Sequence, residues 1–342
     1  MEKTFYVACW QKEGGVYEMR FDLFSGRFTS VQKAAEGTYT SYFERDGEIL
    51  YVLSEIPGPR AGLLESFRVT EEGLIPLDRL SGIPGGCPHM RLTRGGKVLA
   101  AASYETGDVF TVQADAGRFG GVISLLKHSG HGADPVRQAC SHGHMVCETP
   151  DGGYLVCVDL GTDEIRVYAM DEAGALTEHS SVQVPAGYGP RHMLFSPDGG
   201  YAYVVCELKY RLLTFRYPGS GRFEPVGDLE VIPGLEKGQH AGGAIKLSRD
   251  GKALFTTNRG TEESSVDVLS LSDPAHPAWR GALTGLSHPR DILFFSDGDK
   301  EYLLCPNLTR SVVTVWAYDP KKSSFTFLDG TDAVPRPGSV TA

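Results

Sequence analysis

The sequence predicts an all-β protein, a seven-bladed β-propeller with four-stranded antiparallel blades. Three observations support this fold class. Glycine and proline are abundant, with 42 and 20 of the 342 residues, which indicates many turns and many short strands. A turn signal recurs about every 50 residues. Each signal is followed by a nearly uniform apolar run, which is typical of a strand covered on both faces.

The turn signals divide the chain into units. Each signal is an Asp-Gly or Gly-Gly pair, because these residues accept the backbone conformations of tight turns. The pairs are Asp46-Gly47, Gly95-Gly96, Asp151-Gly152, Asp198-Gly199, Asp250-Gly251 and Asp297-Gly298. Regular units of this length indicate propeller blades, in which stacked sheets bury both faces and closure of the ring protects the sheet edges.

Four strands can be recognised in a unit. A short apolar segment precedes the turn, as at residues 192–195, and the uniform apolar run follows it, as at residues 154–158, 201–206, 254–257 and 302–305. A more alternating run comes next, at residues 165–168, 212–217, 266–271 and 312–318. A further run, as at residues 222–231, completes the unit.

The two ends of the chain are predicted to share the seventh blade. The N-terminal part supplies three strand-like runs, residues 5–10, 16–21 and 27–31, but no innermost strand. The lone segment 337–342 lies at the other end of the sequence. We therefore expect this segment to pair beside residues 5–10 and close the ring, so that residues 1–342 form a single propeller domain.

Composition limits the classes of ligand. Acidic residues outnumber basic ones by 43 to 33, which gives a net charge of −10 and disfavours binding to nucleic acid or to an anionic membrane. A small anionic ligand remains compatible, because a few arginines focused in a cleft outweigh a distributed negative surface at short range. The sequence leaves the oligomeric state open.

The cysteines and the apolar runs indicate the cellular setting. The seven cysteines are an odd number without a C-x-x-C pair, and several lie in apolar runs, where a thiol packs as a small hydrophobe. The first 14 residues lack the apolar core of a signal peptide, and no stretch reaches about 18 apolar residues. We therefore expect a cytoplasmic protein without a metal site or a cofactor.

Polar residues gather at equivalent points of successive units. A propeller brings the starts of its innermost strands and the ends of the neighbouring strands around a central channel, so these residues are expected to lie close together. The groups are Arg137-Gln138 with Ser141-His142-Gly143-His144, then Gly187-Tyr188-Gly189-Pro190-Arg191-His192 with Glu207, then Thr257-Asn258-Arg259-Gly260, and finally His288-Pro289-Arg290.

With these motifs the chain resembles the lactonase family of seven-bladed propellers, which includes propeller-type 6-phosphogluconolactonase and carboxy-cis,cis-muconate cyclase. The resemblance covers nearly the whole chain. It is carried by Arg137-Gln138 with His142-x-His144, Asp159-Leu160-Gly161-x-Asp163, Gly187-x-Gly189-Pro190-Arg191-His192, Val205-x-Glu207-Leu208 and Asn258-Arg259-Gly260.

The resemblance implies a catalytic site made of His144, Arg191, Glu207 and Arg259. His142 is the neighbouring imidazole, and we prefer His144 because it stands six residues before Pro150, the offset of the family's site histidine. Further candidates for substrate binding are Arg137, Gln138, His142, Asn258 and Arg290.

These residue types suit the opening of a lactone. Hydrolysis needs a base that activates water, which His144 or Glu207 can supply, and positive charge where the carbonyl oxygen becomes an oxyanion, which Arg191 or Arg259 can supply. Arginine also binds carboxylate and phosphate groups with its planar fork. The sequence does not decide which of the two candidate bases acts.

The function expected from this site is hydrolysis of a sugar-acid lactone, with 6-phosphogluconolactone as the substrate and 6-phosphogluconate as the product. That activity would belong to carbohydrate metabolism and the pentose phosphate pathway. Two alternatives stay open at this point. The same residues could support a muconate cyclase or isomerase, and a propeller can also act without catalysis as a ligand-binding or scaffold protein.

Structural roles compete with the catalytic ones. Arg191 and Arg259 could clamp neighbouring blades together, with Glu207 as the partner that neutralises them. His192 should point away from Arg191, because successive side chains alternate along an extended segment. Asp159 and Asp163 are expected to organise a strand end and a turn by accepting hydrogen bonds from backbone amides.

Overall fold

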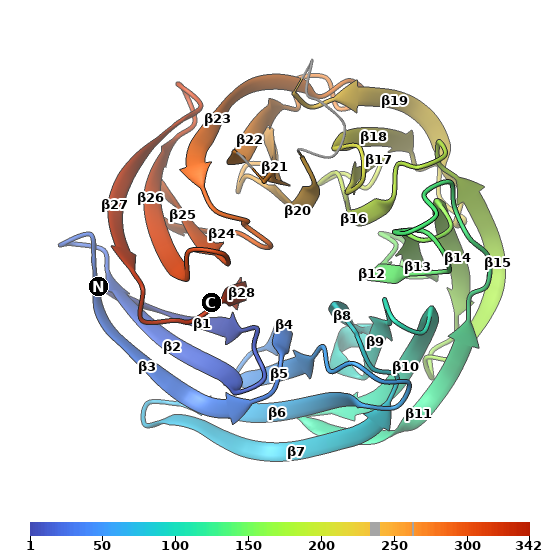
Figure 1. Ribbon diagram of the computed structural model, residues 1–342, viewed down its shortest axis with the longest axis horizontal. Helices are drawn as coiled ribbons and strands as arrows, with labels where there is room; N and C mark the ends of the chain where they lie inside the picture. The colour runs from blue at the N-terminus through green and yellow to red at the C-terminus, as the bar shows by residue number, and fades with distance from the viewer. Residues whose placement is uncertain (233–239, 262) are drawn as a thin grey trace.

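The computed structural model describes residues 1–232, 240–261 and 263–342. Within these ranges the chain forms seven four-stranded antiparallel sheets arranged in a ring (Figure 1). The only helical element in the same ranges is a short 3-10 turn, Arg94–Gly96, and no helix there is long and apolar enough to cross a membrane. The predicted fold class, a seven-bladed propeller with four-stranded antiparallel blades, is confirmed.

Each blade runs from an innermost strand at the centre of the ring to an outermost strand at its rim (Figure 1). The innermost strands are β28 (Pro337–Thr341), β4 (Thr40–Asp46), β8 (His89–Thr93), β12 (Gly143–Glu148), β16 (Pro190–Phe195), β20 (Gly242–Leu247) and β24 (Leu293–Asp297). The second strands are β1 (Glu2–Cys9), β5 (Ile49–Ser54), β9 (Val98–Ala102), β13 (Tyr154–Asp159), β17 (Tyr201–Cys206), β21 (Ala253–Arg259) and β25 (Lys300–Asn307).

The outer half of each blade is built in the same order. The third strands are β2 (Gly14–Asp22), β6 (Gly62–Thr70), β10 (Asp108–Asp115), β14 (Glu164–Met170), β18 (Arg211–Arg216), β22 (Ser264–Ser270) and β26 (Val312–Asp319). The outermost strands are β3 (Arg27–Gly37), β7 (Gly73–Ile83), β11 (Arg118–Lys127), β15 (Leu176–Gln183), β19 (Glu224–Glu230), β23 (Ala278–Leu286) and β27 (Ser324–Thr331).

Each of the six turn signals joins an innermost strand to the second strand of the same blade. Gly199 and Gly251 have φ angles of 74° and 67°, a region that glycine enters without steric cost. The preceding aspartate fixes the turn. The Oδ1 atom of Asp198 accepts hydrogen bonds from Ser196 Oγ at 2.6 Å and from the Gly200 amide at 3.0 Å. The turn between these two strands is therefore specified by the local sequence. It lies at the end of the blade that is remote from the candidate site.

The ring closes through the two ends of the chain, as the sequence predicted. β28 pairs antiparallel with β1, with Thr341 opposite Tyr6 and Val340 opposite Val7. The closing blade (β28, β1, β2, β3) thus takes its innermost strand from the C-terminal segment (Figure 1). This pairing leaves no unpaired inner edge on β1.

The apolar core is divided among the contacts between blades. Among the described residues, seven apolar clusters occur, one at each junction of neighbouring blades. Alternate residues of β17 serve two junctions: Ala202 and Val204 pack toward the β12–β15 blade, whereas Tyr203 and Val205 pack toward the β20–β23 blade. This explains why the second strands are nearly uniformly apolar. Six of the seven cysteines are buried, and Cys140 is exposed.

Candidate active site

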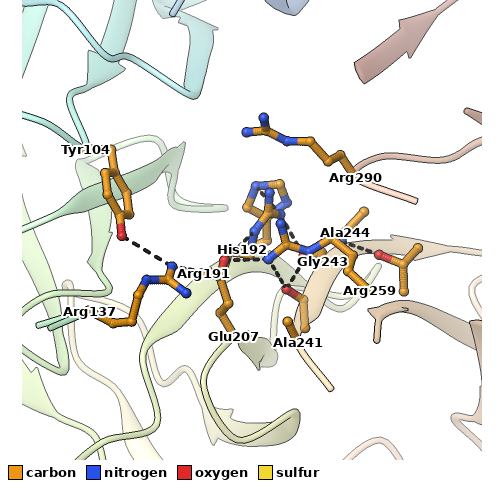
Figure 2. A network of polar contacts seen from close by, with 12 residues as sticks. Tyr104, Arg137, Arg191, His192, Glu207, Ala241, Gly243, Ala244, Arg259 and Arg290 are labelled. Carbon is orange, nitrogen blue, oxygen red and sulfur yellow. Dashed lines mark hydrogen bonds and ion pairs between the residues drawn. The ribbon is translucent and has the colours of Figure 1, made fainter. Parts of the chain in front are cut away.

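Strand starts and strand ends bring the four predicted catalytic residues to one end of the ring. His144 lies at the start of β12 and Arg191 at the start of β16, while Arg259 ends β21 and Glu207 follows the end of β17. Innermost strands begin where second strands end, because the two are antiparallel neighbours. All four side chains are buried. Figure 2 shows Arg191, Glu207 and Arg259 in direct contact.

The Glu207 carboxylate is the hub of this group. Its Oε2 atom accepts hydrogen bonds from Arg191 Nε at 3.1 Å and from Arg259 Nη2 at 2.5 Å. Its Oε1 atom accepts from Arg137 Nη2, which also donates to the Tyr104 hydroxyl at 3.3 Å (Figure 2). Three guanidinium groups from three parts of the chain are therefore fixed around one carboxylate, which we call the Glu207 hub.

Two arginines of the hub also donate hydrogen bonds to backbone carbonyls of the glycine pair at the start of β20. Arg191 Nη1 donates to Gly243 O at 2.8 Å, and Arg259 Nη2 donates to Gly242 O at 2.7 Å. A Cβ atom on Gly243 would lie 2.1 Å from Thr257 Oγ1, so a side chain cannot be accommodated there without rearrangement. Among the described residues, neither Arg191 Nη2 nor Arg259 Nη1 has a hydrogen-bond partner. Each arginine keeps one donor nitrogen for a ligand.

Irregularities in the strand pairing aim the side chains at the start of the innermost strands. The register between β12 and β13 shifts around His144, and that between β16 and β17 shifts around Arg191. A bulge of this kind adds a residue on one strand and redirects its side chain, and it is common beside active sites. His144 and Arg191 are therefore the extra residues of two bulges.

The electrostatic balance keeps Glu207 ionised. Burial alone would raise the pKa of its carboxyl group, but Arg259 and Arg191 outweigh burial and hold this pKa well below its usual value. Both carboxylate oxygens already accept hydrogen bonds from guanidinium groups. A carboxylate in this state is a weak base at neutral pH, and its clearest physical role is to order the arginines.

His144, in contrast to the ionised Glu207, is kept uncharged. Burial, followed by the positive charge of Arg191, lowers the pKa of its imidazole well below the usual value. The ring is therefore neutral at neutral pH, and its unprotonated nitrogen can accept a proton, with a lower basicity than an ordinary imidazole. Its Nδ1 atom is buried and has no hydrogen-bond partner among the described residues. The ring centroid lies 5.2 Å from that of His192 and 6.0 Å from that of Tyr104.

The expected orientation of His192 is wrong. Its Nε2 atom lies 3.0 Å from Arg191 Nη1, so the two side chains meet instead of pointing apart. The register shift at Arg191 is the physical reason, because alternation along the strand fails at a bulge. The His192 ring also packs against the His89 ring, with 5.7 Å between the ring centroids. Both imidazoles are buried, and burial is the main cause of their lowered pKa values.

The two histidines of the His142-x-His144 motif are separated by Tyr104. The His142 ring stacks on the Tyr104 ring at 4.1 Å, and its Nδ1 atom is hydrogen-bonded to the Tyr104 carbonyl. His144 lies edge-on to the same tyrosine and is the imidazole whose pKa responds to Arg191, Glu207 and Arg259. The structure thus places His144 in the electrostatic field of the Glu207 hub.

Gln138 and Asn258, both predicted to bind substrate, are engaged in shaping loops. Gln138 is fully buried, donates to Leu160 O at 2.8 Å and accepts from the Asp134 amide at 3.0 Å. Asn258 Nδ2 lies 2.7 Å from the Nδ1 atom of His240. Gln138 precedes the loop into β12 beside Arg137, and Asn258 precedes Arg259, so each fixes the backbone next to an arginine of the hub.

Arg290 stands apart from the Glu207 hub. It lies just before β24, and its Nη2 atom forms an ion pair with Glu55 Oε2 at 3.3 Å. Figure 2 shows it near Arg259 without a hydrogen bond to the hub. Its charge nevertheless reaches the site: after burial and Arg191, Arg290 is a further cause that lowers the pKa of His144.

The two aspartates of the Asp159-x-x-x-Asp163 motif accept backbone hydrogen bonds, as predicted. Asp159 Oδ1 accepts from the His142 amide at 2.8 Å and from the Gly161 amide at 3.0 Å. Asp163 accepts from the amides of Gly187 and Gly189 at 2.7 and 2.8 Å. The Asp163 contacts fix the loop that leads into β16 and thereby the position of Arg191, whereas the Asp159 contacts fix the start of the segment that leads into β12.

Sequence reasoning missed Tyr104 and the glycine pair before the β20 apolar run. A signal was present for Tyr104, because it follows the second strand of its blade as Glu207 does. For Gly243 the sequence offered a weaker indication. Gly243 stands seven residues before the turn aspartate Asp250, just as Arg191 stands seven residues before Asp198 in the preceding unit. Its function is visible only once Arg191 is seen to donate to its carbonyl.

Comparisons with known proteins agree with this architecture. The model of the lactonase family, described as a seven-bladed β-propeller, matches residues 4–342. A 6-phosphogluconolactonase of Bacillus subtilis is 29% identical over 345 residues, covering 98% of this chain and 97% of that protein. A periplasmic gluconolactonase of Pseudomonas aeruginosa has a TM-score of 0.89 at 26% identity, covering 100% and 99% of the two chains.

A structure from Lactobacillus plantarum shares the fold. It has a TM-score of 0.89 at 24% identity and covers 99% of each chain. The family model, the sequence relative and the solved structures all extend over essentially the whole ring. The chain belongs to the lactonase family of seven-bladed β-propellers.

Proposed function

We propose that this protein is a lactonase that opens 6-phosphogluconolactone to 6-phosphogluconate. One observation carries the proposal: two arginines fixed by Glu207 each keep a free donor nitrogen in the same buried group as a neutral histidine. Lactone hydrolysis requires this combination of a base and concentrated positive charge. The similarity to the Bacillus subtilis 6-phosphogluconolactonase supports the choice of substrate.

In the proposed reaction His144 is the general base. It removes a proton from a water molecule, whose oxygen attacks the lactone carbonyl carbon. Arg191 Nη2 and Arg259 Nη1 donate to the oxyanion that forms, which is worth about 10²–10³-fold in rate for a single preorganised donor. The ring C–O bond then breaks, and the protonated His144 returns its proton to the departing oxygen. Glu207 holds the arginines and takes no proton.

The other predicted binding residues are assigned by their contacts. Arg137 shares Glu207 with the other arginines and is half-exposed, so we propose that it contacts the substrate at the rim. Gln138 and Asn258 act as positioning residues, because their amides already bind loop atoms. His142 orients Tyr104 by stacking.

The purified protein should release acid from 6-phosphogluconolactone faster than the spontaneous reaction. His144→Gln should lower kcat by about 10²–10⁴-fold, the usual contribution of a general base. His179→Gln provides a matched control, because His179 lies exposed on the outermost strand β15. A wild-type rate equal to the spontaneous rate would exclude the proposal, and equal losses in both variants would exclude His144 as the base.

A second candidate substrate is gluconolactone without a phosphate group. The Pseudomonas aeruginosa neighbour, at 26% identity, is named a gluconolactonase and favours this alternative. Both substrates use the same base and oxyanion chemistry. Parallel measurement of kcat/KM for the two lactones decides between them, and we expect the phosphorylated lactone to be preferred.

We further propose that the protein works in the cytoplasm and that residues 1–342 form one domain. The reducing environment of the cytoplasm suits seven free cysteines. Cell fractionation followed by immunoblotting tests the location. A single cooperative unfolding transition, seen by both fluorescence and circular dichroism, is expected of one domain.

A further inference from the structure

A second arginine–glutamate pair lies at the same end of the ring as the Glu207 hub. Arg290 precedes the innermost strand of its blade, where Arg191 stands in the β16–β19 blade. Glu55 follows a second strand, as Glu207 does. Arg290 and Glu55 are 235 residues apart in sequence and meet at 3.3 Å. The repeat of the propeller therefore places a counterpart of the Arg191–Glu207 pair on another side of the central axis.

Trp10 holds the Arg290 guanidinium in place. Trp10 follows β1 in the closing blade, and the Arg290 guanidinium lies 4.5 Å from its ring centroid. Such a contact with tryptophan is favourable and restricts the motion of the long side chain. Arg336 lies over the same ring at 5.3 Å and donates to the Trp10 carbonyl at 3.3 Å. The Arg290 side chain is only 16% exposed, so it is a preorganised cation.

Several donors beside this cation have no partner. Among the described residues, Arg290 Nε and Nη1 make no hydrogen bond. The indole Nε1 atom of Trp10 is buried and also lacks an acceptor. Buried indole N–H groups usually find a partner, and leaving a donor unsatisfied is costly. The unused donors indicate a place for an acceptor group.

The charges around the site are not balanced. Four guanidinium groups, those of Arg137, Arg191, Arg259 and Arg290, face two carboxylates, those of Glu207 and Glu55, so two positive charges remain. This excess occurs in a protein with a net charge of −10. In the Glu207 hub, three arginines share one carboxylate. Arg290 instead pairs with a carboxylate of its own, that of Glu55. Both uncompensated charges therefore lie at the hub, and what the Arg290–Glu55 pair offers an acceptor group is the unused donor atoms of Arg290.

We propose that Arg290, stacked on Trp10, forms a subsite for a phosphomonoester at the end of the substrate remote from the reacting carbonyl. The inference rests on the proposed lactonase function and extends it by naming the residue that distinguishes phosphorylated from unphosphorylated lactones. A phosphate oxygen would accept from the free Nε and Nη1 atoms of Arg290. Glu55 pairs with the guanidinium, which Trp10 holds in place, and competes with the phosphate for it.

Substitution of Arg290 should separate the two lactones. For Arg290→Gln we expect KM for 6-phosphogluconolactone to rise by about 10- to 100-fold with kcat nearly unchanged, the effect of losing a charged hydrogen bond. The kcat/KM for gluconolactone should change by less than about twofold, because that substrate lacks the phosphate group. Equal losses for both lactones, or no loss for either, would overturn the subsite.

Glu55→Gln should shift KM for the phosphorylated lactone in the opposite direction from Arg290→Gln. This difference distinguishes a phosphate subsite from an ion pair with a purely structural role. If Arg290 and Glu55 only clasp the ring, both substitutions should weaken the protein in the same way. The subsite instead predicts that Glu55→Gln lowers KM for the phosphorylated lactone by a few-fold, because a competing carboxylate is removed. A raised KM would contradict the subsite. Arg94→Gln is the matched control, since Arg94 pairs with Glu148 at 3.2 Å, has a similarly buried side chain and lies in the turn at the other end of its strands.

Binding of the product acid separates failure of the subsite from failure of the proposed function. Calorimetric titration of the wild type with 6-phosphogluconate and with gluconate requires no turnover. Tighter binding of 6-phosphogluconate that is lost in Arg290→Gln supports the subsite, even if neither lactone is hydrolysed. Equal affinity of the wild type and Arg290→Gln for 6-phosphogluconate would overturn it, even if lactonase activity is found.

Discussion

Replacing Glu207 with glutamine tests the hub on which the site is built. The substitution keeps the size of the side chain and removes the negative charge that three guanidinium groups share. The pairs with Arg191 and Arg259 are buried, and removing one partner of a buried ion pair costs about 3–5 kcal/mol because the remaining charge is left uncompensated. The Arg137 side chain is 45% exposed, so its pair adds only about 0–1 kcal/mol.

Equilibrium unfolding in urea measures this loss directly. We expect Glu207→Gln to reduce the free energy of unfolding by about 3–5 kcal/mol and to lower kcat/KM together with it, since the arginines lose their alignment. Glu224→Gln is the control: its pair with Arg216 joins two exposed side chains, and the change should stay within about 0.5 kcal/mol.

The double variant Glu207→Gln/Arg259→Gln provides an internal check. It should recover part of the stability lost in Glu207→Gln, because one uncompensated charge is removed with the carboxylate. A Glu207→Gln protein within about 1 kcal/mol of the wild type would refute the view that the Glu207 carboxylate holds the buried arginines of the hub together.

Three further predictions follow from the same contacts. His144 must be neutral to act as a base and its pKa is lowered, so kcat/KM should stay flat from pH 8 to pH 6 and decline only at more acidic pH; a decline centred near pH 6.5 would contradict this assignment. The pKa values of His89, His144, His192 and His288 are lowered in the fold, so the unfolded chain takes up protons first as pH falls below about 6.5 and stability should drop by about 5 kcal/mol per pH unit, measured by urea unfolding. A slope near zero between pH 6 and 5 would count against buried neutral imidazoles. Deleting residues 337–342 exposes the edge of β1 and should give aggregation or a much lower melting temperature, whereas unchanged thermal unfolding would contradict ring closure by the tail.

The fold could be predicted because its signals are local and repeated. Asp198-Gly199 and its counterparts specify the turn by short-range hydrogen bonds, and the uniform apolar runs follow from burial between two blades. The role of the tail followed from counting strands, since β1 lacked an inner neighbour. These features depend on composition and spacing, which a single sequence displays.

The detailed geometry of the site could not be predicted in the same way. A one-residue bulge at Arg191 brings His192 beside it, and nothing in the local sequence marks that shift. Gln138 looks like a ligand-binding residue by type, but loop packing turns its amide inward. The contact between Arg290 and Glu55 joins parts of the chain 235 residues apart and depends on ring closure.

A crystal structure with bound 6-phosphogluconate would show whether the arginines of the Glu207 hub and His144 form the lactonase site. We expect a carboxylate oxygen of the product to lie about 3 Å from Arg191 Nη2 and Arg259 Nη1, within reach of His144, while the phosphate contacts Arg290. A ligand bound elsewhere on the ring, or one that leaves both arginine nitrogens without a contact, would contradict it.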